Sequence, residues 1–133
     1  MNKRMLLIGF AISMLVFSSL ACEASASTAN IASAKLTTDN TGASETTSFT
    51  PDQTFYLVVD LANAPDTTKV KAVWYMVDEA GAATQIAEKE IVGSGSPITF
   101  NASNNAGPWP VGNYRAELYL NDKLDKTLDF TVE

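Results

Sequence analysis

The sequence predicts an all-β fold, a single antiparallel β-sandwich of about seven strands, and three observations lead to this prediction. Short stretches in which apolar and polar residues alternate recur along the chain. Clusters of glycine, proline, asparagine and aspartate separate these stretches. No segment of useful length has the apolar period of an amphipathic helix. Because alternation places every second side chain on one face, each stretch can bury one side against a shared core.

The first four strands follow directly from the alternation. They are expected at 31–38, 54–63, 69–78 and 84–92. In the second, "TFYLVVDLAN", Phe55, Leu57 and Val59 fall on one face. In the third, "KVKAVWYMVD", Val70 and Trp74 share the inward face. We therefore expect these two strands to supply the centre of the core.

The remaining three strands lie in the C-terminal third of the chain. They are expected at 98–102, 114–121 and 126–132. Tyr114 and Leu118 face inward from the sixth strand, and Phe130 and Val132 face inward from the seventh. A tight turn at Asn121–Asp122 joins these two strands into a hairpin.

The segment "WPVGNYRAELYLNDKLDKTLDFTVE", with Trp74 earlier in the chain, resembles a broad group of bacterial immunoglobulin-like exported domains. The resemblance covers residues 31–133. It implies an immunoglobulin-like β-sandwich in which Trp74 is the core tryptophan and Tyr114 forms a tyrosine corner. Sandwich domains of this kind serve unrelated purposes, so the resemblance implies fold and export rather than an activity.

The first residues have the order of a secretory signal peptide, which we place at 1–21. Lys3 and Arg4 form a short basic start, and an apolar run without charge follows to Leu20. The small polar residues 22–30, "CEASASTAN", predict a flexible tether, and 31–133 form the domain.

Cys22 is the chain's single cysteine, and two interpretations of it stay open. The segment that ends at Ala21 and Cys22 resembles a bacterial lipoprotein signal, which implies an acylated cysteine and a membrane-anchored lipoprotein of the bacterial cell envelope. Alternatively, cleavage after Ala26 discards Cys22 and leaves a free periplasmic or secreted domain. We favour lipidation; in either case no disulfide can stabilise the domain.

Composition excludes several classes of function. The chain has 15 acidic and 9 basic residues, and without Lys3 and Arg4 the formal charge is −8, which argues against nucleic acid as a partner. There is no histidine, so the commonest general base and metal ligand are absent. We interpret "Asp39-Asn40-Thr41-Gly42" as a turn and not a calcium loop. We expect no catalytic residue, no metal and no cofactor.

The outward side chains of the third and sixth strands are the first candidate binding surface. These strands are neighbours in an immunoglobulin-like sandwich, so their outward residues would form one patch. The candidates are Tyr75, Arg115, Glu117 and Tyr119. The competing interpretation is that aromatic and β-branched residues simply suit strands.

Trp109, between two prolines in "GPWPVG", is the second candidate. It could stack on a sugar or anchor a partner, or it could close the open end of the sandwich. We favour a non-catalytic binding or accessory domain that contacts another envelope protein. The alternatives are a carbohydrate-binding module that uses Trp109 on a polysaccharide, and a small proteinase inhibitor that presents "NNAGPWP".

Overall fold

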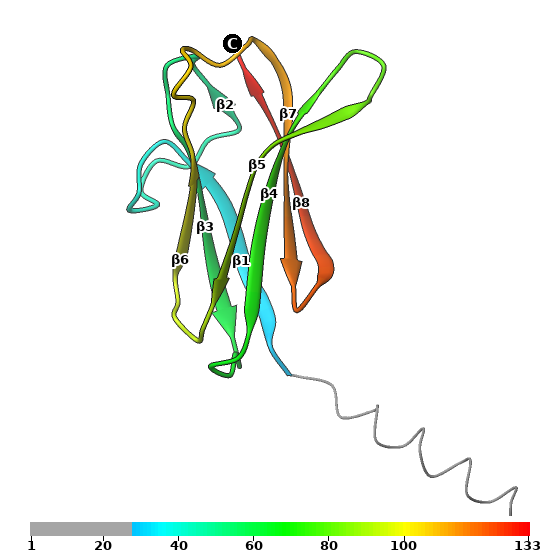
Figure 1. Ribbon diagram of the computed structural model, residues 1–133. Coiled ribbons are helices and arrows are strands. Elements are labelled where there is room, and N and C mark those ends of the chain that lie inside the picture. Colours follow the sequence, from blue (N-terminus) through cyan, green and yellow to red (C-terminus); the bar gives the residue numbers. More distant parts are fainter. Residues whose placement is uncertain (1–27) are drawn as a thin grey trace, which may run out of the picture.

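The computed structural model describes residues 28–133, which form eight β-strands and no helix (Figure 1). The strands are β1 (Asn30–Thr37), β2 (Ser48–Phe49), β3 (Phe55–Ala62), β4 (Lys69–Val77), β5 (Ala83–Val92), β6 (Ile98–Ala102), β7 (Gly112–Leu120) and β8 (Lys123–Val132). The expected signal peptide, Cys22 and most of the tether lie outside the described residues.

The strands form two sheets with the core between them (Figure 1). One sheet has the order β1-β3-β6, and the other has the order β2-β8-β7-β4-β5. Every pairing is antiparallel except that of β2 with β8, which is parallel. The prediction of an all-β sandwich is confirmed.

Seven of the strands correspond to those expected from the alternation, six of them with ends within two residues, and two larger differences occur. The two-residue strand β2 was not predicted, because two residues are too few to display alternation. Strand β8 begins at Lys123 rather than at residue 126, because Asn121 and Asp122 have φ angles of 49° and 69°. Such a two-residue turn lets the hairpin pair from its first residues, and Leu120 pairs with Lys123.

An aromatic cluster occupies the centre of the core. Trp74 is 0% exposed and Tyr114 is 1% exposed. Phe55 contacts five other rings, with centroid distances of 4.6 to 6.0 Å, and these belong to Phe49, Trp74, Trp109, Tyr114 and Phe130. The rings come from both sheets and from the loop before β7, so the cluster connects the two sheets to each other and to this loop.

Val58 is also buried, although it points outward from the middle of the three-stranded sheet. The loop between β1 and β2 covers it, because a Cβ on Gly42 would lie 3.4 Å from Val58 Cγ2. Gly42 has a φ of 80°, in the left-handed region that favours glycine. The loop therefore packs on the sheet through a residue without a side chain.

Asp39 organises the same loop. Its carboxylate accepts hydrogen bonds from Thr41 N, Thr41 Oγ1, Ala43 N and Ser44 N, at 2.7 to 3.1 Å. The bond from the Thr41 side chain, followed by those from Ala43 and Ser44, holds the pKa of Asp39 well below its usual range. The carboxylate oxygens are thus occupied by donors, which supports the interpretation of residues 39–42 as a turn.

Acid should weaken the domain partly through Asp39. A depressed folded-state pKa means that this stabilisation is complete above the unfolded value of about 3.9 and is lost as pH falls towards the folded value. We expect Asp39→Ala to lower the urea midpoint near neutral pH. Its deficit against wild type should shrink as pH falls from about 5 towards 2. Wild type and Asp39→Ala share every other carboxyl group. A difference between their urea midpoints that stays constant with pH would therefore contradict the stabilising role of the Asp39 carboxylate.

Candidate functional site

The outward residues of β4 and β7 lie side by side on the five-stranded sheet. The strands pair so that Lys71 is opposite Tyr119, Val73 is opposite Glu117, and Tyr75 is opposite Arg115. Directly opposed side chains on one face are within contact distance. We call this surface the outer-sheet patch, and its members are Lys71, Val73, Tyr75, Arg115, Glu117 and Tyr119.

Contacts within the patch hold its polar side chains in place. The Tyr119 hydroxyl donates a 2.9 Å hydrogen bond to Glu117 Oε1. The ammonium group of Lys71 lies 4.8 Å from the centroid of the Tyr119 ring. Arg115 Nε donates to Asp129 Oδ1 on β8, at 3.3 Å. The patch is therefore partly ordered by these contacts.

Val73 lies at the centre of the patch and is only 3% exposed, although it points away from the core. Its cross-strand neighbours are Glu117 on β7 and Glu88 on β5. The long side chains around it must cover it, because within residues 28–133 no further strand packs on this face. The patch thus presents aromatic rings and charged groups above a covered apolar residue.

Both tyrosines of the patch have a raised pKa. For Tyr75 the largest cause is burial, and the negative charge of Glu117 comes next. For Tyr119 the largest cause is its hydrogen bond to Glu117. A carboxylate beside a phenol disfavours the phenolate, so Glu117 raises the pKa of both rings.

Glu117→Gln should therefore lower the pKa of both Tyr75 and Tyr119 towards the ordinary value of about 10. An alkaline titration followed by the ultraviolet absorbance of phenolate measures this change. Glu45→Gln removes a carboxylate from the loop beside the other sheet and should leave the titration curve as in wild type. A curve that Glu117→Gln does not move would show that the carboxylate does not contact these phenols.

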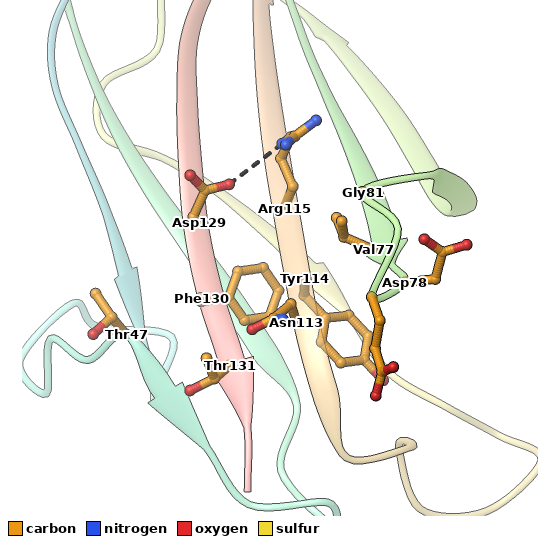
Figure 2. A pocket seen from close by; sticks show the side chains of 11 residues that line it. Thr47, Val77, Asp78, Gly81, Asn113, Tyr114, Arg115, Asp129, Phe130 and Thr131 are labelled. Carbon is orange, nitrogen blue, oxygen red and sulfur yellow. Dashed lines mark hydrogen bonds and ion pairs between the residues drawn. The ribbon is translucent and has the colours of Figure 1, made fainter.

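A hollow of about 520 Å³ adjoins the patch near the β4–β5 turn. Figure 2 shows the ion pair of Arg115 and Asp129 on one of its walls and Asp78 on the turn opposite. Glu79 also lines it, so the lining includes three carboxylates, of which Asp129 pairs with Arg115. No pattern in the sequence predicts this hollow, because it forms only where the turn and β8 flank the end of the sheet.

Trp109 lies apart from the patch and packs into the core. It is 9% exposed and stacks on Phe55, with a centroid distance of 4.6 Å and an interplanar angle of 16°. Its Nε1 donates to the carbonyl oxygen of Gln53 at 3.0 Å, and its backbone N donates to that of Pro51 at 2.7 Å. This packing supports the interpretation of Trp109 as a plug, because little of the indole can reach a sugar ring.

Tyr114 begins the buried row of β7 and ties the same loop to the sheet. Its hydroxyl donates a 2.6 Å hydrogen bond to the carbonyl oxygen of Pro110, four residues earlier. Burial raises the pKa of this phenol. Tyr114 therefore fixes the position of the loop that carries Trp109.

Within residues 28–133, no group of three or more histidine, cysteine, aspartate or glutamate side chains is arranged to hold a metal ion. The same residues contain no helix long and apolar enough to cross a membrane. No protein-family model matches this chain, and no curated protein is similar to it in sequence.

Proposed function

We propose that this chain is an exported, non-catalytic binding domain with an immunoglobulin-like topology. The strand order supports this topology. The pairing β1-β3-β6 corresponds to the A-B-E sheet of such domains, and β8-β7-β4 corresponds to G-F-C. The hydrogen bond from Tyr114 to Pro110 agrees with the tyrosine corner of that fold.

The observation that carries the binding role is the composition and order of the outer-sheet patch. Tyrosine and arginine are enriched among the residues that dominate the affinity of protein interfaces. Here Tyr75, Tyr119 and Arg115 surround a buried valine, and side-chain contacts hold two of them, Tyr119 and Arg115. Side chains that are already ordered lose less conformational entropy on binding.

Charge indicates a partner with basic side chains. Lys3, Arg4 and Glu23 precede residue 28, so the described residues contain 7 basic and 14 acidic side chains and have a net charge of −7. Glu88 and Glu90 flank the patch on β5, and Asp78 and Glu79 line the hollow beside it. Complementary charge guides association and excludes wrong partners. We therefore propose an envelope protein with a basic contact surface.

The anchor is a separate part of the proposal. The lipoprotein-like segment before Cys22 supports attachment to the membrane of the cell envelope. The intact mass and N-terminal sequence of the protein from the membrane fraction test this. An acylated Cys22 supports the anchor, and an unmodified N-terminus at Ser27 would replace it with a free exported domain.

The binding role is tested by a photo-crosslinking amino acid placed at position 75 or 119 in cells. Position 56 is the matched control, since Tyr56 points outward from the other sheet. We expect the sites in the patch to crosslink to one envelope protein, and Glu117→Lys to abolish that product. Equal crosslinking from position 56, or none from the patch, would overturn the proposed surface.

A further inference from the structure

Strand β5 (Ala83–Val92) forms an open edge of the five-stranded sheet. It is the last strand in the order, and within the described residues it pairs only with β4 (Figure 1). The backbone donors and acceptors along its other side are free to pair with a further strand. Natural proteins usually protect an edge of this length with charges or a bulge.

The C-terminal part of β5 has such protection. Lys89 is opposite Ala72, whose side chain is fully buried, so Lys89 starts from the core-facing side of the strand. An inward-pointing charge on an edge strand opposes the addition of another strand, because a neighbour would desolvate it. Glu88 and Glu90 add charge on the outward side.

The N-terminal part of β5 lacks such charges, and its bulge lies only at its end, at Ile86. The register shifts by one residue between the pairs Trp74–Ala87 and Tyr75–Gln85, which leaves Ile86 as the extra residue of a bulge. The segment before and at the bulge, Ala83–Ile86, has the sequence Ala-Thr-Gln-Ile and carries no charge. The edge is thus divided at Ile86 into a protected and an unprotected part.

An apolar pocket of about 310 Å³ lies beside the unprotected part. Thr84 is opposite Met76, and Met76 lines the pocket. The core-facing side of Ala83–Ile86 therefore lies next to the pocket. Residues 103–104, which follow β6, provide its polar rim. Its other walls are Met76, Ile86, Trp109, Pro110 and Tyr114.

We propose that Ala83–Ile86 accepts an extended segment of a partner protein as an additional strand, with one large apolar side chain of that segment seated in the pocket. Main-chain hydrogen bonds to an open edge give such complexes affinity, and a pocket for an alternate side chain gives specificity. The volume is at the lower end of the usual range for ligand pockets, roughly 300–1,000 Å³. It therefore suits one side chain rather than a large ligand.

The charges around the edge favour a basic partner segment over a second copy of this domain. Glu79 in the β4–β5 turn precedes the segment, and Glu88 follows it. Lysine or arginine on either side of the apolar residue would pair with these carboxylates. Two copies would instead bring like charges together, and each has a net charge of −7 in its described residues.

The test uses the mature protein and synthetic peptides Lys-Thr-Lys-X-Lys-Thr-Lys, in which X is phenylalanine, leucine, alanine or aspartate. Amide NMR titration and hydrogen exchange report affinity and position. We expect the phenylalanine and leucine peptides to bind at least about tenfold more tightly than the alanine and aspartate peptides. We also expect binding to protect amides within 83–86 from exchange.

Thr84 is exposed and starts from the core-facing side of β5, as Lys89 does. Thr84→Lys therefore places a second lysine on that side, and it should remove the preference of the protein for peptides with an apolar X. Val92→Lys adds the same charge at the far end of β5, where Val92 is 58% exposed, and should keep the preference. If neither variant changes the preference, the pocket is not the site. Binding that is independent of X and shifts only the amide signals of the outer-sheet patch would overturn the proposal. The absence of binding at millimolar peptide would also overturn it. So would a dimer formed through β5.

Discussion

Replacing Trp74 with alanine is expected to lower the free energy of unfolding by about 3–5 kcal/mol, the usual cost of truncating a large buried aromatic residue. The side chain is 0% exposed and lies 6.0 Å, between ring centroids, from both Phe55 and Phe130. Because domains of this size are stable by only about 5–15 kcal/mol, the variant should be largely destabilised or unfolded. Equilibrium unfolding in urea measures the change.

Trp74→Phe separates the loss of packing from the loss of the indole N–H. Within residues 28–133, Trp74 Nε1 is buried without a hydrogen-bond acceptor. Phenylalanine removes this unsatisfied group and keeps part of the ring contact, so its cost should be clearly smaller than that of alanine. A melting temperature of Trp74→Ala within a few degrees of wild type would contradict the inward orientation of β4.

Alternation predicted the core because a period of two leaves little freedom in β3, β4 and β7. Once one large apolar residue such as Phe55 faces inward, every second residue must follow it. The burial of Val58 and Val73 was not predictable in this way. Val58 depends on a loop that folds over the sheet, and Val73 depends on long side chains from two other strands.

The outer-sheet patch could be expected from the sequence, because the resemblance to immunoglobulin-like domains implies that the third and sixth expected strands are neighbours. The apolar pocket beside Ala83–Ile86 could not be expected in this way. It depends on a bulge at Ile86, which shifts the register by one residue, and on the position of the loop that carries Trp109. Neither feature leaves a pattern in the sequence around it. Surfaces built on regular pairing are thus predictable, whereas hollows at irregular points require the structure.

The sequence does not decide whether Trp109 is a binding residue or a plug, because two flanking prolines stiffen a loop without showing where its side chain points. The two roles give different results in one experiment. A plug that stacks on Phe55 and donates to Gln53 O should make Trp109→Ala cost about 3–5 kcal/mol in the free energy of unfolding. A residue that served only to bind a sugar or a partner would change stability by no more than about 0.5 kcal/mol.

Trp109→Phe is the matched variant, and its comparison with Trp74→Phe sharpens the test. Both exchanges shrink a buried indole in the same aromatic cluster, yet only Trp109 loses a hydrogen bond, the 3.0 Å contact from Nε1 to Gln53 O. An unpaired carbonyl left behind at the end of the sandwich adds a cost of roughly 1–3 kcal/mol if water cannot reach it. We therefore expect Trp109→Phe to be the more damaging of the two, as measured by urea unfolding under the same conditions. The reverse order would mean that the loop moves to follow the smaller ring, and that Trp109 does not close the sandwich as a fixed plug.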